Sequence, residues 1–135
     1  MEGSTLEEAK LKLSQLDNRF DNLKKIQNVF LHCYFNSKDT DLLFNKLISN
    51  EKTDFSRYNY FYARHLDNKG QKIEARKIIK KALKKYPRNL ILNQYEVNLE
   101  LQKNFSDFNC SNKVEIVAEL LYICLLYTSD AADEV

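Results

Sequence analysis

The stretch from Tyr58 to Asn89 constrains the fold most, because small and apolar residues recur at helical spacing around two residues that end helices. The recurring side chains are Tyr62, Ala63, Leu66, Ala75, Ile79 and Ala82. Steps of three and four residues place side chains on one face of an α-helix. Gly70 interrupts the pattern, and Pro87 ends it because proline lacks the amide hydrogen of the helical ladder. The pattern predicts two helices, over Phe55–Asn68 and Gln71–Tyr86, joined by a tight turn.

This helix pair resembles a tetratricopeptide repeat, a unit of about 34 residues in which small side chains let two helices approach closely. The repeat's Ala, bulky apolar, Ala and Pro positions match Ala75, Ile79, Ala82 and Pro87. Asn59 stands where an aromatic residue is usual, and Ala63 stands where glycine is usual. The clearest match covers residues 56–89, and the longer stretch Asp54–Glu100 is similar to tetratricopeptide proteins of AT-rich bacteria. The resemblance implies a short right-handed solenoid of stacked antiparallel helix pairs that binds other molecules.

Composition supports an all-α fold. The chain has 135 residues with two Gly, one Pro and no Trp, which is a poor supply of residues for turn-rich strands. No apolar run reaches the roughly 18 residues of a membrane span, and the Met1–Ser4 start is unlike a signal peptide. Cys33, Cys110 and Cys124 show no metal-ligand spacing, which favours reduced thiols. The sequence therefore predicts a cytoplasmic protein.

The N-terminal segment is predicted to form one or two amphipathic helices. Thr5 and Glu8 match a capping box, in which a hydroxyl accepts from a backbone amide at the helix start. A heptad pattern follows, over Leu6, Ala9, Leu13, Leu16, Phe20, Leu23, Gln27, Phe30 and Tyr34. The alternative to helices packed on the repeat is a coiled coil that oligomerises the protein. Polar residues over Asp17–Arg19 mark a break between two helices.

Weaker helix pairs flank the clear repeat. Asp21–Asn50 is interpreted as a divergent repeat whose second helix begins at Asp39 or Thr40. A third pair begins at Arg88 or Asn89, and its second helix follows a cap at Asn112. The chain is thus divided into 1–20, an N-terminal helix or short coiled coil, 21–123, the repeats, and 124–135, a tail.

The tail is predicted to be foreign to the native protein. Cys124–Glu134 resembles the translation of an adapter used to prepare DNA sequencing libraries. Without the three carboxylates of residues 124–135, the formal net charge changes from +2 to +5. We therefore expect the native sequence visible here to stop near Ile123.

A peptide groove is the first candidate site. In repeats of this kind the first helices line a concave face, and their outward positions are implied to be Arg57, Tyr60, Arg64, Asp67 and Asn68. The matching positions of the next repeat are Ile91, Gln94, Asn98, Leu101 and Gln102. Arg64 beside Asn98 can hold a peptide carboxylate or backbone by charge-assisted hydrogen bonds. The alternative is a solvated polar face.

A basic surface is the second candidate site. It comprises Arg76, Lys77, Lys80, Lys81, Lys84, Lys85 and Arg88, opposite the apolar face of the same helix. Such a stripe attracts phosphates or acidic partners, although it lacks the interleaved aromatic residues that stack on bases. The alternative is a soluble outer face.

Catalysis finds little support in the sequence. His32 and Cys33 are neighbours, and neighbouring helical side chains point about 100° apart. His65 has no carboxylate at helical spacing to orient it, and no zinc or phosphate-loop pattern is present. We expect a scaffold or adaptor that binds a protein or peptide, with no enzyme activity, cofactor or metal. The alternatives are an oligomerisation module and a basic surface for nucleic acid or acidic partners.

Overall fold

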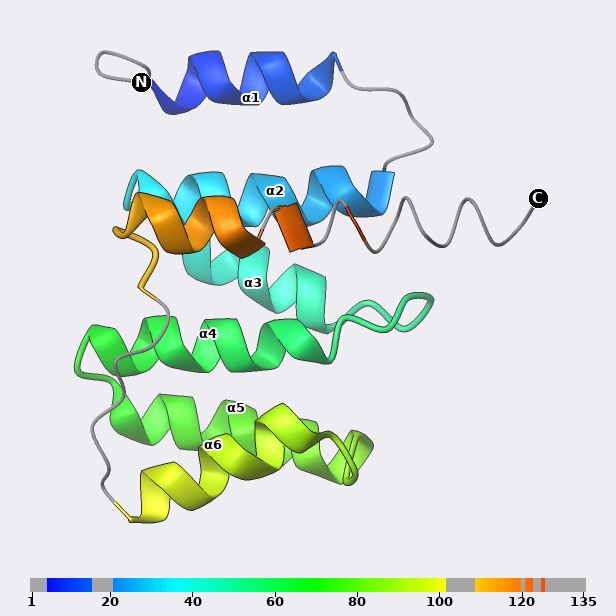
Figure 1. Cartoon of the computed structure of the whole chain (residues 1–135), viewed down its shortest axis with the longest axis vertical. Coiled ribbons are helices and arrows are strands. Elements are labelled where there is room, and N and C mark those ends of the chain that lie inside the picture. The colour runs from blue at the N-terminus through cyan, green and yellow to red at the C-terminus, as the bar shows by residue number, and fades with distance from the viewer. Residues whose placement is uncertain (1–4, 16–20, 102–108, 120, 123–124, 126–135) are drawn as a thin grey trace. The chain divides into compact units, whose positions relative to one another are not determined.

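The chain is all-helical wherever its structure is described. The computed structural model describes residues 5–15, 21–101, 109–119, 121–122 and 125, and contains no strand among them (Figure 1). The helices are α1 (Leu6–Ser14), α2 (Asp21–Tyr34), α3 (Thr40–Ile48), α4 (Arg57–Asn68), α5 (Lys72–Lys85) and α6 (Leu90–Glu100). A further helical segment spans 113–119. The predicted all-α class is confirmed.

The chain divides into two compact units. Unit 1 comprises Met1–Thr40 and Cys110–Val135, and unit 2 comprises Asp41–Asn109. The predicted repeat region 21–123 contains all of unit 2, but α2 groups with α1 in unit 1. The predicted break at Asp17–Arg19 and nearly all of the tail 124–135 lie outside the described residues. None of the described helices has the length and hydropathy needed to cross a membrane.

Two antiparallel helices, α1 and α2, form the N-terminal part of unit 1 (Figure 1). The amide of Glu8 donates to the Thr5 hydroxyl at 3.2 Å, which is one half of the predicted capping box. The buried residues Ala9, Leu23 and Phe30 belong to the predicted heptad. Because α1 ends at Ser14 and α2 begins at Asp21, the heptad segment forms two helices.

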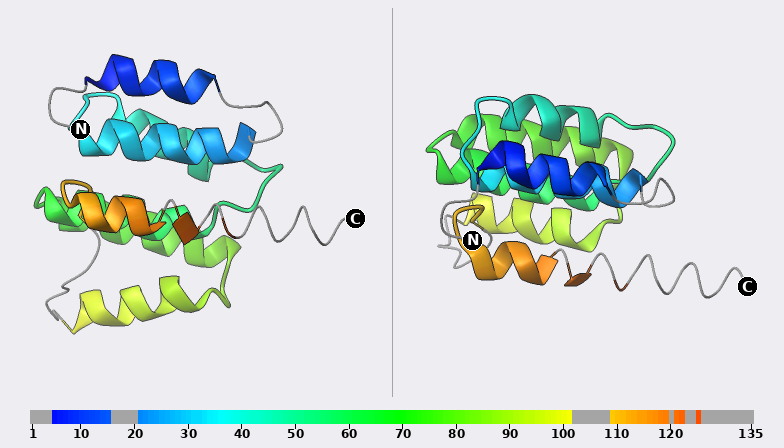
Figure 2. Two further views of the ribbon diagram at one scale, coloured as in Figure 1. Left: turned by 45° about the horizontal axis from the view of Figure 1, so that its top comes forward. Right: turned by 90° about the horizontal axis from the view of Figure 1, so that it is seen from above.

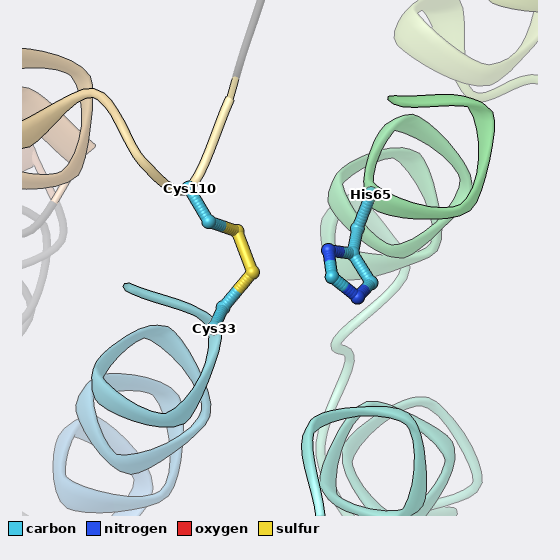
Figure 3. Close-up of side chains that lie close together, drawn as sticks. All are labelled: Cys33, His65 and Cys110. Atoms are coloured by element: carbon cyan, nitrogen blue, oxygen red, sulfur yellow. A yellow bond between two sulfur atoms is a disulfide. The ribbon is translucent and has the colours of Figure 1, made fainter. Parts of the chain in front are cut away.

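A disulfide joins the two chain segments of unit 1. Figure 3 shows the bond between Cys33, near the end of α2, and Cys110, with Cα atoms 5.5 Å apart and 77 residues between them in sequence. Both cysteines are buried. The expectation of reduced thiols is therefore wrong for this pair. Since disulfides persist in oxidising compartments, the cytoplasmic location loses one of its supports and stays a prediction.

The helix pair α4–α5 in unit 2 follows the predicted pair within two residues at each end (Figure 2). Gly70 adopts a φ of +80°, a left-handed conformation that favours glycine. The Gln71 amide donates to the Leu66 carbonyl, and the Gly70 amide donates to the Asp67 carbonyl, each at 2.9 Å. These two bonds form a Schellman motif, which ends α4 and turns the chain into α5.

Small residues bring the helices of unit 2 together. Ala63 and Ala75 are fully buried, and Ala82 is nearly so. An alanine presents little side-chain bulk, so the backbones of α4 and α5 can approach closely. Ile79, with 1% of its surface exposed, fills the space between these small residues and supplies apolar burial.

The third helix of this group, α6, packs on both α4 and α5 (Figures 1 and 2). Asn89 caps it, since its side-chain oxygen accepts from the Leu92 amide at 3.1 Å. The same Asn89 side chain donates to the Ser56 hydroxyl, at the start of α4, at 3.3 Å. The starts of α4 and α6 are thus joined across 33 residues of sequence, and the two helices run in the same direction.

Candidate functional site

Two of the predicted groove residues, Arg64 and Asp67, form an ion pair within unit 2. Arg64 has 4% of its surface exposed, so the predicted outward orientation of this residue is wrong. Its Nη1 atom lies 3.1 Å from Oδ2 of Asp67, one helical turn further along α4. Tyr95 of α6 donates its hydroxyl to the same oxygen at 3.4 Å, and the Arg64 guanidinium lies 5.8 Å from the Tyr95 ring centre. The charged pair therefore ties α4 to α6.

Tyr95 stays neutral in this cluster. Burial, followed by the negative charge of Asp67, raises the pKa of the Tyr95 hydroxyl to about 12. The Arg64 guanidinium opposes part of this rise. Because the hydroxyl keeps its proton at neutral pH, it remains a donor to the Asp67 carboxylate.

The other groove positions are more accessible. Tyr60 is half-buried, with its ring edge-on to that of Tyr95 at 5.4 Å. Arg57 is half-buried with its guanidinium 5.3 Å from the Phe61 ring centre. On α6, Gln94 is exposed and donates to the side-chain oxygen of Asn98, which is half-buried, at 3.1 Å. Arg57, Tyr60, Gln94 and Asn98 are called the α4–α6 face below.

Several apolar side chains of α6, and one directly after it, are exposed. Leu90 is 85% exposed and Val97 is 47% exposed. Leu101, one of the groove positions, is 58% exposed. Among the remaining groove positions, Asn68 is exposed and Ile91 is half-buried, while Gln102 lies outside the described residues.

The predicted basic surface is exposed at every position. All seven of its side chains, from Arg76 to Arg88, are accessible along and just beyond α5. Lys77 pairs with Glu74 at 3.2 Å, and Arg76 donates to the Leu99 carbonyl of α6 at 3.3 Å. The Lys85 ammonium lies 5.3 Å from the Tyr86 ring centre. Part of the stripe thus has structural contacts as well as solvent exposure.

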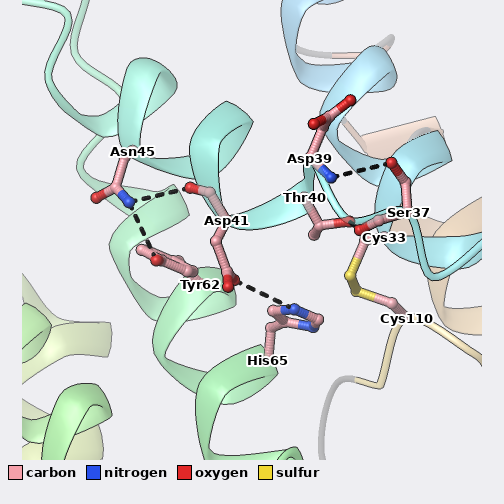
Figure 4. Close-up of polar contacts among 9 residues, drawn as sticks. All are labelled: Cys33, Ser37, Asp39, Thr40, Asp41, Asn45, Tyr62, His65 and Cys110. Atoms are coloured by element: carbon pink, nitrogen blue, oxygen red, sulfur yellow. Dashed lines mark hydrogen bonds and ion pairs between the residues drawn. A yellow bond between two sulfur atoms is a disulfide. The ribbon is translucent and has the colours of Figure 1, made fainter.

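A buried histidine has a carboxylate partner that sequence spacing did not reveal. Figure 4 shows Nε2 of His65 facing Oδ1 of Asp41, at 3.6 Å, from a different helix. The His65 ring also lies 5.9 Å from that of Phe44. Burial, followed by the Lys69 ammonium, lowers the pKa of His65 below its usual 6.5, and the Asp41 carboxylate opposes part of that shift. His65 is therefore neutral at pH 7.

The second histidine contacts a hydroxyl. Nδ1 of His32 lies 2.9 Å from the Ser37 hydroxyl, and burial, followed by Lys10, lowers the pKa of His32. Cys33, its neighbour, is held in the disulfide and is not a free nucleophile. His32 is thus bonded to Ser37, and Cys33 to Cys110.

No family model, curated protein or solved structure matches the chain. A proposal for the function therefore rests on the geometry of unit 2.

Proposed function

We propose that unit 2 is a short tetratricopeptide-like scaffold that binds a protein or peptide on the α4–α6 face, without catalysis. The observation that carries the proposal is the Ser56–Asn89 hydrogen bond, which links the starts of two parallel helices 33 residues apart. A spacing of about 34 residues between equivalent helices is typical of tetratricopeptide repeats. The alanines buried between α4 and α5 fit the same arrangement.

The chemistry of the α4–α6 face suits a polypeptide ligand. Tyr60 and Arg57 offer an amphipathic ring and a guanidinium, the side-chain types enriched among residues that dominate binding energy. Gln94 and Asn98 offer amide groups for an extended backbone. Arg64 and Asp67 hold α4 against α6 from within. A face fixed in this way loses little entropy when it binds.

A peptide-display selection on the full chain, followed by variants, tests the proposal. We expect selected peptides to lose at least about tenfold in affinity to Tyr60→Ala, because truncation of an aromatic anchor costs about 2 kcal/mol or more. Tyr86→Ala is the matched control, since Tyr86 is also half-buried but lies after α5. Failure to select any peptide, or equal loss in both variants with unchanged melting temperatures, would contradict binding on this face.

A further inference from the structure

Unit 2 contains a cavity that sequence analysis did not anticipate. It has a volume of about 360 Å³ and lies between α3, α4 and α5. Its apolar lining comes from Ile48, Ile78 and Ala82. Its polar lining comes from Asn45, Ser49, Glu51, Asn59, Lys81 and Lys85. The volume is at the lower end of the range for small-ligand pockets, roughly 300–1,000 Å³.

A buried amide lines this cavity with an acceptor to spare. Asn59 is 6% exposed, and its Nδ2 donates to the Ser56 carbonyl at 3.1 Å, which fixes the orientation of the amide. Its Oδ1 accepts no hydrogen bond from the residues that the structure describes. This oxygen is therefore available to accept a hydrogen bond from a ligand that carries an N–H group.

A neighbouring amide, that of Asn45, also uses its nitrogen to bond to protein acceptors. Nδ2 of Asn45 donates to the Asp41 carbonyl at 3.0 Å and to the Tyr62 hydroxyl at 3.1 Å (Figure 4). These bonds direct the nitrogen of Asn45 toward protein acceptors and leave its oxygen for a donor. Two of the polar groups lining the cavity therefore offer acceptors.

Two lysines give one side of the cavity a positive charge. Lys81 and Lys85 are one turn apart on α5, and side chains at this spacing lie on the same side of a helix. Neither forms an ion pair with a described carboxylate. Glu51 is the one acidic residue of the lining, so the lining is positive by one charge. A ligand group with one negative charge would neutralise the lining.

We propose that this cavity binds an N-acylated apolar amino acid with a free carboxylate, as found at the C-terminus of a peptide. The apolar side chain lies against Ile48, Ile78 and Ala82, and the amide N–H donates to Oδ1 of Asn59. The carboxylate pairs with Lys81 and Lys85 through charge-assisted hydrogen bonds. A single amino-acid residue of the ligand thus matches the apolar side chains, the amide oxygen and the lysines of the lining.

This site is independent of the α4–α6 face. Arg57 and Asn59 are two residues apart on α4, so their side chains point about 200° apart around the helix. None of the cavity residues belongs to the α4–α6 face. The peptide selection with Tyr60→Ala and the experiment below can therefore fail separately.

An NMR titration of the full chain tests the proposal with N-acetyl-leucine and with N-acetyl-leucinamide, which lacks the carboxylate. We expect the acid to shift the Asn59 and Ala82 amide signals with a dissociation constant of about 1 mM, since small ligands bind weakly. The amide should bind about tenfold more weakly, because it loses its pairs with two lysines, which together are worth about 1.4 kcal/mol. A pentapeptide that ends in leucine distinguishes a peptide C-terminus, which would bind more tightly, from a free acylated amino acid.

A pair of double variants isolates the role of the two lysines. Lys81→Gln with Lys85→Gln should weaken the acid at least about tenfold, whereas Lys80→Gln with Lys84→Gln should leave it unchanged. The control pair makes the same charge change at the same spacing on the same helix, but outside the cavity lining. All four lysines are exposed, so both variants should fold. Equal binding of acid and amide, equal weakening by both variants, or no shift of the cavity amides would overturn the proposal.

Discussion

Unit 2 takes its helices from one continuous stretch, Asp41–Asn109, whereas unit 1 joins Met1–Thr40 to a distant segment that begins at Cys110. In unit 2 the helices α4, α5 and α6 pack on one another, and the α4–α5 turn is fixed by Gly70. In unit 1 the distant segment is fastened by the Cys33–Cys110 disulfide. The entropy lost on closing a loop grows with the length of the loop. Bringing the Cys110 segment to α2 in unit 1 therefore costs more conformational entropy than pairing α4 with α5 in unit 2.

The difference assigns a separate source of stability to each unit. Unit 2 depends on close packing around small residues, and a core change should therefore affect it most. Unit 1 depends in part on a covalent bond, and the loss of that bond should affect it most. Three experiments test this division.

Removal of the disulfide should have the largest effect. Cys33→Ser with Cys110→Ser should lower the stability of unit 1 by about 4 kcal/mol, because the bond closes a long loop in the unfolded chain. Hydrogen exchange of the α2 amides measures the loss. The α5 amides in the same spectra are the control, and we expect their protection to change little. An equal fall in α2 and α5 would show that the two units unfold together.

A cavity in the core of unit 2 should have the next largest effect. Ile79→Ala should destabilise unit 2 by about 3 kcal/mol, since it removes buried methyl groups and leaves a void. Urea denaturation followed by circular dichroism measures the change. Ile73→Ala on the same helix is the matched control, since Ile73 is 72% exposed, and should cost less than about 0.5 kcal/mol. Similar losses for the two variants would contradict the packing of α5 described above.

The smallest effect should be a pH dependence of unit 2 through His65. Its folded pKa is lowered by burial, so the unfolded chain binds the proton more readily. Stability is therefore fully present above the unfolded pKa of about 6.5 and falls as the pH drops below it. His65→Gln should flatten this fall between about pH 7 and pH 5, measured as hydrogen exchange of the α4 amides. His32→Gln, a change in unit 1, should leave the slope for α4 as it is in the wild type.

The helices of unit 2 could be predicted from local signals in the sequence. Gly70 and Pro87 set the ends of α4 and α5, and Asn89 marked the start of α6, because each acts on the backbone within a few residues. The exposed stripe on α5 followed from helical periodicity alone. Such signals need no knowledge of distant contacts.

Contacts between distant residues could not be predicted in the same way. The Cys33–Cys110 bond and the His65–Asp41 pair join residues too far apart in the sequence to lie on one helix, so helical periodicity does not reveal them. Arg64 was placed outward by analogy with other repeats, yet it pairs with Asp67 and lies beside the Tyr95 ring inside unit 2. The cavity beside Asn59 depends on how three helices meet, which the pattern of one helix cannot show.

The 5.5 Å between the Cα atoms of Cys33 and Cys110 brings the two ends of the 34–109 segment, which includes all of unit 2, close together. Chains accept insertions most readily where entry and exit are neighbours, because the host then needs no rearrangement. Helix pairs could be added to or lost from the middle of this chain with the disulfide geometry unchanged. Unit 1 thus has the geometry of a domain that accepts an insertion, and the segment between Cys33 and Cys110 is free to vary in length.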